Sequence, residues 1–234
     1  MPVPSVERPS AAPLGILMLD THFPRVRGDI GNARSFDFPV LYHVVDGATP
    51  RRVATRTDPA LLDAFLEGAR RLERAGVQAI TTSCGFLALW QKELSAAVSV
   101  PLLTSSLLQV PLAWRLTGGR PVAIVTARAA NLSPGHLAAV GIDKMPLFVT
   151  GLDGATEFTR VFIDDATTLR EEAVRQEVLR RTLDIVEAHE EIGAIVLECT
   201  NLPPYADALR QATKRPVFDI LTLCNHVVRS LRPL

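Results

Sequence analysis

Residues 79–101 read AITTSCGFLALWQKELSAAVSVP, and residues 194–216 read AIVLECTNLPPYADALRQATKRP. The two stretches lie 115 positions apart, and each carries an apolar run, a cysteine, a helix-like segment and a proline in the same order. Identical residues occupy matching positions: Ala79 and Ala194, Ile80 and Ile195, Cys84 and Cys199, Leu87 and Leu202, Leu94 and Leu209, Ala97 and Ala212, and Pro101 and Pro216. Two of the three cysteines therefore align at one strand-to-helix junction. This repeat predicts a duplicated half-domain.

Strands and helices alternate on both sides of the repeat. Apolar runs bounded by turn residues predict strands at 14–19, 40–45, 77–81, 100–104, 121–126 and 194–197. Asp58 and Pro59 begin a helix that ends at Gly76, and periodic apolar residues predict helices at 86–98 and 169–190. Such alternation is typical of a mostly parallel sheet flanked by helices. We predict an α/β fold of two similar half-domains related by pseudo-two-fold duplication, with the site between them.

The predicted boundaries follow from composition. Residues 1–13 contain four prolines and predict a disordered N-terminal arm. Residues 14–117 form the first half-domain with Cys84, with a last helix that can cross over, and residues 118–234 form the second with Cys199. Residues 23–56 are rich in Pro, Gly, Asp and Asn, so we treat this long irregular segment as a candidate lid.

Composition excludes several classes of protein. The 234 residues include 25 Lys and Arg against 25 Asp and Glu, so no net positive field favours nucleic acid. No apolar run reaches the roughly 18 to 20 residues that span a bilayer, and the first residues lack a signal-peptide core. We expect a cytoplasmic protein that binds neither nucleic acid nor membrane. Three cysteines do not make a disulfide framework, which leaves them as packing residues, metal ligands or reactive thiols.

Two of the cysteines are placed for chemistry. In open α/β sheets the ligand crevice lies outside the carboxyl ends of the strands, and Cys84 and Cys199 each follow such an end. Two facing halves would bring both thiols to one cleft, where one thiolate removes a proton and the opposed thiol protonates the other face of the carbanion. We expect the charge of the intermediate to be stabilised by helix-terminal amides, which would also lower the thiol pKa, and by nearby hydroxyls. These amides and hydroxyls belong to Thr82, Ser83, Gly85, Phe86, Thr126, Thr200 and Asn201.

The residues from Ile80 to Cys84 and from Ile195 to Leu202 resemble the two cysteine motifs of the aspartate/glutamate racemase superfamily. This superfamily includes amino-acid and hydantoin racemases, maleate isomerases and arylmalonate decarboxylases. The resemblance covers residues 14–234 and implies that Cys84 and Cys199 are the acid/base pair. It also implies substrate contacts by Thr126, by the amide of Thr200 and, from the family's substrate loop, by Asp20. A homodimer is common for such folds.

The chain also departs from that family pattern. Gly85-Phe86 replaces the usual Asn-Thr, and Thr200-Asn201 replaces the frequent Thr-His. A polar clamp on an amino acid is thus partly missing, and Phe86 favours a flatter or more apolar substrate. Arg25 could hold a carboxylate from the lid, although a solvated loop is the commoner role for such a segment.

Metal and cofactor chemistry finds little support in the sequence. Cys224 and His226 lack the spacing of a structural zinc site, and Cys224 is interpreted as a packing residue of a terminal helix. A pyridoxal enzyme needs a Schiff-base lysine, yet Lys92, Lys144 and Lys214 lie in a helix, a turn and before a strand. We therefore expect no metal and no cofactor.

The sequence thus predicts a cofactor-independent racemase or epimerase that inverts the α-carbon of an amino acid or related carboxylate. Its partner would be that small-molecule carboxylate, and a homodimer is the candidate assembly. Within the same superfamily, a hydantoin racemase, a maleate-type cis-trans isomerase or an arylmalonate-type decarboxylase using Cys199 stays open. A ligand-binding protein that kept only the fold is the alternative outside enzymes.

Overall fold

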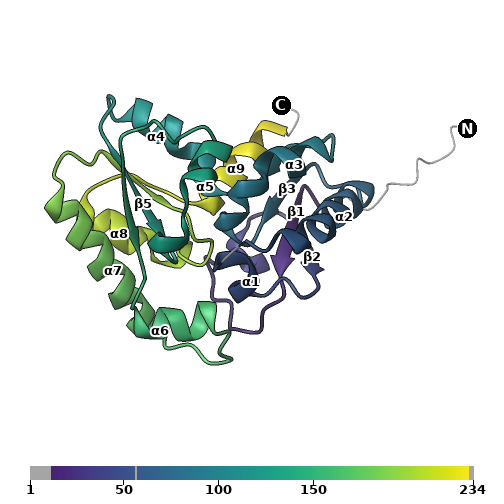
Figure 1. Cartoon of the computed structure of the whole chain (residues 1–234), viewed down its shortest axis with the longest axis horizontal. Helices are drawn as coiled ribbons and strands as arrows, with labels where there is room; N and C mark the ends of the chain where they lie inside the picture. Colours follow the sequence, from purple (N-terminus) through teal and green to yellow (C-terminus); the bar gives the residue numbers. More distant parts are fainter. Residues whose placement is uncertain (1–11, 56, 232–234) are drawn as a thin grey trace, which may run out of the picture.

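The computed structural model describes residues 12–55 and 57–231, and it contains two four-stranded parallel sheets (Figure 1). Most of the predicted N-terminal arm at 1–13 lies outside the described residues. The first sheet has the order β2-β1-β3-β4, with β1 at Leu14–Leu19, β2 at Val40–Val45, β3 at Ala79–Thr82 and β4 at Leu102–Leu103. The second has the order β6-β5-β7-β8, with β5 at Val122–Thr126, β6 at Leu147–Gly151, β7 at Ala194–Leu197 and β8 at Val217–Phe218. The predicted α/β fold of two similar halves is confirmed.

The central strands are apolar along their whole length because both of their faces are covered. Every residue of β1, β3, β5 and β7 is buried. Parallel strands with helices on both faces read as continuous apolar runs rather than as alternating patterns. This is why the sequence located these four strands, while the half-exposed edge strand β6 was not predicted.

The repeat seen in the sequence corresponds to equivalent elements in the two sheets. Strands β3 and β7 begin 115 residues apart, at Ala79 and Ala194, and β4 and β8 keep the same spacing. Strands β1 and β5 do not keep the spacing of 115 residues, because the connection from β6 to β7 is longer than the connection from β2 to β3. The additional residues belong to a segment that contains a short π-helix, η6, at Thr159–Ile163.

Helices cover both sheets. The α-helices are α1 (Pro50–Ala54), α2 (Leu62–Arg74), α3 (Gln91–Ala96), α4 (Val110–Leu116), α5 (Pro134–Ala139), α6 (Thr156–Phe158), α7 (Glu171–Ala188), α8 (Ala206–Thr213) and α9 (Ile220–Leu231). Short 3-10 helices are η1 (Ala33–Ser35), η2 (Pro59–Leu61), η3 (Gly85–Trp90), η4 (Ser106–Gln109), η5 (Ala129–Asn131) and η7 (Pro203–Tyr205). The helix predicted at 86–98 is therefore divided between η3 and α3. As predicted, Asp58 caps the start of the segment that leads into α2, since its side chain accepts the Ala60 N–H.

Two helices join the halves by packing on the sheet of the other half. Helix α4 follows the first sheet in sequence but packs against β5 and β7. Helix α9 follows the second sheet but packs against β3 of the first sheet. Its residues Ile220 and Cys224 share one apolar cluster with Leu14 and Ile16 of β1. Cys224 is fully buried there, as its packing role requires.

Across residues 12–55 and 57–231, none of the helices combines the length and the apolar character needed to cross a membrane.

Candidate active site

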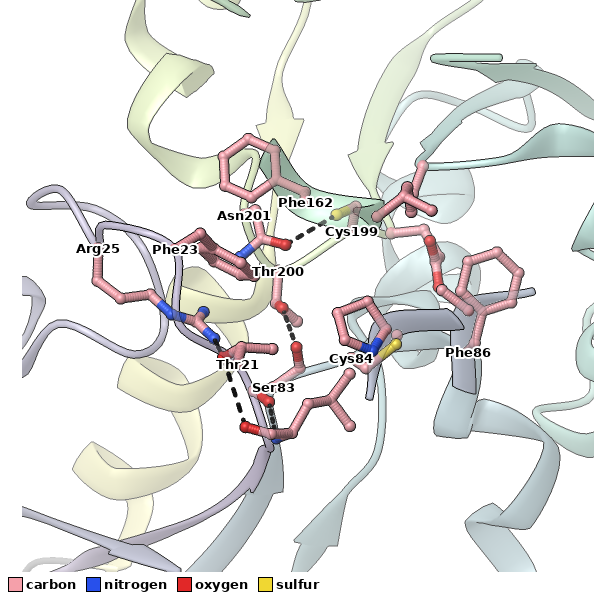
Figure 2. A pocket seen from close by; sticks show the side chains of 17 residues that line it. Thr21, Phe23, Arg25, Ser83, Cys84, Phe86, Phe162, Cys199, Thr200 and Asn201 are labelled. Atoms are coloured by element: carbon pink, nitrogen blue, oxygen red, sulfur yellow. Dashed lines mark hydrogen bonds between the residues drawn. The ribbon is translucent and has the colours of Figure 1, made fainter. Parts of the chain in front are cut away.

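A small cavity lies where the carboxyl ends of β1, β3 and β7 meet. Cys84 follows β3, Cys199 follows β7, and both thiols lie on its wall (Figure 2). The volume is about 30 Å³, which holds roughly two water molecules. The two cysteines that the repeat singled out are therefore brought to one enclosed space. A ligand larger than two waters needs some movement of the wall.

Hydrogen bonds between the halves fix the two cysteine loops relative to each other. The Thr200 hydroxyl donates to the Ser83 carbonyl at 2.6 Å, so residues next to each cysteine are joined directly. The Ser83 hydroxyl in turn accepts the Leu19 N–H at 2.8 Å. These hydrogen bonds connect the two cysteine loops directly, which favours the defined geometry that proton transfer requires.

A chain of polar side chains orients the Cys199 thiol. Its S–H donates to Asn201 Oδ1, with sulfur and oxygen 3.6 Å apart. The Asn201 amide donates to Asp29 Oδ2 at 2.7 Å, and Asp29 Oδ1 accepts from Arg25 at 2.8 Å. Arg25 also donates to the Thr21 hydroxyl at 2.7 Å and lies over the ring of Phe23.

Arg25 lies on the cavity wall. The alternative, a solvated loop that faces away from the site, does not describe this residue. No sequence motif pointed to Asp29, which is distant from Asn201 along the chain.

The surroundings of both thiols favour the protonated form. Burial raises the pKa of Cys84 and of Cys199, and the negative charge of Glu198 raises both further. The backbone N–H groups of Phe86 and Asn201 lower the respective pKa values, as expected for amides at these turns. The prediction that these amides leave the thiol pKa depressed is nevertheless wrong, because burial outweighs them.

Glu198 is the main site residue that the sequence did not single out. Its side chain is 1% exposed and lines the cavity. Oε2 accepts a hydrogen bond from the Thr126 hydroxyl at 2.6 Å, whereas Oε1 is buried without a partner among the described residues. Burial raises the pKa of this carboxyl to about 7. A carboxyl group that titrates near neutrality beside two thiols is typical of functional sites.

The structure places the predicted substrate-binding residues in two groups. Ser83, Gly85, Phe86, Thr200 and Asn201 line the cavity, and three others do not. The Asp20 carboxylate accepts the Gly47 N–H, and the Thr82 hydroxyl donates to the carbonyls of Thr104 and Cys84. Thr126 is directed to Glu198. The contact of these three with a substrate stays a prediction.

The outer wall of the cavity is built from segments of both halves. Phe23, Pro50 and Ala54 come from the segment proposed as a lid, and Phe162 and Ile163 come from the π-helix η6. The rings of Phe23 and Phe162 (Figure 2) meet edge to face, and their centroids lie 5.0 Å apart. Next to them, Asp165 accepts the backbone N–H groups of His22 and Phe23 at 2.7 and 3.1 Å. Its second carboxylate oxygen pairs with the His22 ring at 2.8 Å.

Asp165→Ala is expected to loosen this contact much more than His22→Ala. Asp165 accepts hydrogen bonds from two backbone N–H groups as well as pairing with the ring. A hydrogen bond to a charged group is worth about 1.5–3 kcal/mol, so the loss of one raises the equilibrium constant for local opening roughly tenfold or more. Hydrogen–deuterium exchange at the amides of residues 22 and 23 measures the effect. Unchanged exchange in Asp165→Ala would contradict this role.

The pH dependence of the same contact has a definite sign. The hydrogen bond and charge of Asp165 raise the pKa of His22 above 6.5. The ring therefore adds stability that is fully present below that pH and is lost as pH rises through the raised pKa. The hydrogen bonds that Asp165 accepts from the backbone N–H groups of His22 and Phe23 do not depend on the protonation of the His22 ring.

Metal ligation finds no support among the described residues, since no three His, Cys, Asp or Glu side chains gather as ligands would.

Comparison with known proteins identifies the family of the chain. The family model described as Asp/Glu/Hydantoin racemase matches residues 39–224. The chain belongs to this family. The family resemblance drawn from the two cysteine motifs is thereby confirmed, and the family is one of enzymes.

Among curated relatives, a dimethylsulfoniopropionate lyase from Durusdinium sp. clade D is 31% identical over 226 residues, covering 93% of this chain and 74% of the relative. Dimethylsulfoniopropionate lyase 6 from Emiliania huxleyi is 32% identical over 229 residues, covering 93% of this chain but 59% of the relative. The chain thus spans only part of these longer proteins.

Among solved structures, allantoin racemase from Klebsiella pneumoniae superposes with a TM-score of 0.61 at 17% identity, covering 93% of this chain and 87% of the racemase. This likeness shows the fold alone. The names of the relatives therefore divide between racemases and lyases.

Proposed function

We propose that the chain is a cofactor-independent lyase that removes the proton next to a carboxylate and expels a sulfonium leaving group from the neighbouring carbon. Dimethylsulfoniopropionate is the first candidate substrate. The observation that carries the proposal is the closed cavity walled by the two thiols of Cys84 and Cys199. The choice of a lyase rests on the curated relatives of that name, which match nearly the whole chain.

The proposed reaction is a β-elimination. A cysteine thiolate takes the proton from C2 of the propionate, and the electrons of that C–H bond form the C2–C3 double bond. The C3–S bond breaks with its electron pair going to sulfur, which releases dimethyl sulfide and leaves acrylate. The proton stays on the cysteine sulfur, so each turnover must return it to solvent.

The cavity offers complementary groups to both ends of such a substrate. Arg25 is positioned to attract the carboxylate, and guanidinium groups bind carboxylates well. The rings of Phe86 and Phe162 line the same cavity, and aromatic faces attract sulfonium and ammonium cations. Because the closed cavity is smaller than the substrate, we expect the wall at Phe23 and Phe162 to move on binding.

Racemisation of a small carboxylate is the second candidate. Elimination needs one base, whereas inversion needs a second acid on the opposite face, and two thiols share this cavity. Removal of the same proton begins both reactions. They differ in whether a leaving group departs or the second thiol returns a proton.

A direct assay separates these candidates. The purified protein is incubated with dimethylsulfoniopropionate, and separately with single enantiomers of amino acids, with hydantoins and with small diacids. We expect dimethyl sulfide in the headspace above the first sample, and the same rate from Cys224→Ala, whose thiol lies in the core under α9. Inversion of an amino acid or hydantoin without sulfide release would favour the racemase. Ligand binding without any reaction would contradict both enzymes.

A further inference from the structure

One acid in the cavity has no part in the reaction as described. Glu198 lies on the wall between the two halves, with one carboxylate oxygen held by Thr126 and the other buried without a partner among the described residues. We propose that Glu198 is the proton acceptor of the cavity, which takes the proton from a cysteine thiol and so forms the reactive thiolate inside the closed site. This inference rests on the proposed function of the thiols as bases.

The position of the carboxyl supports this role. Glu198 directly precedes Cys199, and its Oε1 lies against the backbone of Gly85, which directly follows Cys84. A Cβ atom at position 85 would stand 2.3 Å from Oε1. Only a glycine leaves room for the carboxyl here, and the carboxyl consequently contacts both cysteine loops.

The charges in the cavity point the same way. The negative charge of Glu198 raises the pKa of both thiols, so the three acids favour a single negative charge among them. Burial raises the Glu198 pKa to about 7, still below either thiol, and Thr126 holds it down by its hydrogen bond. The remaining charged groups nearby are Arg25 on the wall and its partner Asp29. The resting charge therefore belongs to Glu198.

The proposed transfer balances in protons. Neither thiol donates a hydrogen bond to Oε1 of Glu198, so the proton passes through a water molecule in the cavity. The S–H bond of the thiol breaks as the water takes its proton, the water gives up another proton to form an O–H bond at Oε1, and the negative charge moves from oxygen to sulfur. The thiolate then takes the proton from C2 of the substrate and becomes a thiol again. Glu198 is left as a carboxylic acid, and it releases its proton to water when the cavity opens. One proton leaves the protein in each turnover.

The test uses Glu198→Gln, which keeps an oxygen for Thr126 but accepts no proton. The matched control is Asp219→Asn, because Asp219 is also a buried carboxyl with a raised pKa but lies outside this cavity. We expect wild-type kcat/KM to rise with pH through an inflection near the Glu198 pKa of about 7. In Glu198→Gln we expect kcat to fall by about 100- to 10,000-fold and the inflection to disappear. Asp219→Asn should keep the wild-type kcat and the inflection near pH 7.

Alkylation of the thiols by iodoacetamide, compared with turnover, distinguishes proton transfer from a simple charge effect. Loss of the carboxylate charge makes both thiols more acidic, so we expect alkylation of Glu198→Gln above pH 7 to be faster in either case. If Glu198 only repels the thiolate, kcat rises together with the alkylation rate; if Glu198 takes the thiol proton, kcat falls although the thiols are alkylated faster. A kcat of Glu198→Gln within about threefold of wild type, or above it, would overturn the proposal.

Thr126→Val provides a second variant in case Glu198→Gln does not fold. The Thr126 hydrogen bond lowers the pKa of Glu198, so its loss should move the inflection of the alkylation profile to higher pH. An unmoved inflection would contradict the role of Glu198. A different result would contradict the proposed function alone. In that case none of the tested carboxylates reacts, but the pH profile of alkylation still has its inflection at the Glu198 pKa.

Discussion

Cys199→Ala is expected to abolish turnover, with kcat/KM lower by about 10⁴-fold or more, because its thiolate is the group that takes the C2 proton of the substrate. Cys199 is the better candidate for the base, since Asn201 and Asp29 orient its thiol. The measurement is product formation by Cys199→Ala, Cys84→Ala and the double variant, with Cys224→Ala as the control for loss of a buried thiol.

The pattern among these variants also identifies the reaction. In an elimination with one base, Cys199→Ala should be as inactive as the double variant, while Cys84→Ala keeps part of the activity. In a racemisation with two bases, each single variant should be as inactive as the double variant. Full activity in Cys199→Ala would contradict a cysteine base at this position.

Gly85→Ala is expected to disrupt the site and to destabilise the protein by about 1–3 kcal/mol, as overpacking of a buried position typically does. The added methyl group would stand 2.3 Å from both the backbone carbonyl and the Oε1 of Glu198. Because Gly85 lies between the two halves, either η3 or the loop after β7 must shift. Urea unfolding measures the stability, and the assay for dimethyl sulfide measures the activity.

Gly135→Ala is the matched control for that substitution. A Cβ atom at position 135 meets its nearest atoms, on Leu89 and Ser133, at 3.4 and 3.5 Å, which is ordinary contact. We expect stability and activity close to wild type. If Gly85→Ala is as stable and as active as Gly135→Ala, the close approach of Glu198 to this backbone is contradicted.

Much of the fold could be predicted because its strands and first helices carry local signals. The buried strands are unbroken apolar runs, and the start of α2 is marked by Asp58 and Pro59. A crossover was expected for the last helix of the first half, which is α4, whereas the packing of α9 on the first sheet could not be predicted in the same way. An apolar helix face shows that the helix is covered but does not say by which sheet.

The candidate site was predictable as far as the repeat extends. Cys84 and Cys199 were found because duplication places both at equivalent strand ends, and their neighbours Ser83 and Thr200 line the cavity with them. Glu198 could not be predicted as a site residue, because its position depends on burial and on contact with Gly85, which is more than a hundred residues away along the chain.

The loop residues behave differently from the strand ends. Arg25 lies on the wall because Asp29 and Thr21 hold it there, which are tertiary contacts without a periodic pattern. Phe162 lies in a π-helix, an element that apolar periodicity does not reveal.

Proton NMR in D₂O with dimethylsulfoniopropionate tests the central claim most directly, since it follows the proton next to the carboxylate. We predict that the wild-type protein produces the vinyl signals of acrylate and the methyl signal of dimethyl sulfide in equal molar amounts, and that Cys199→Ala produces neither. Wild-type protein that leaves every signal of the substrate unchanged, or Cys199→Ala that forms both products at the wild-type rate, would contradict it.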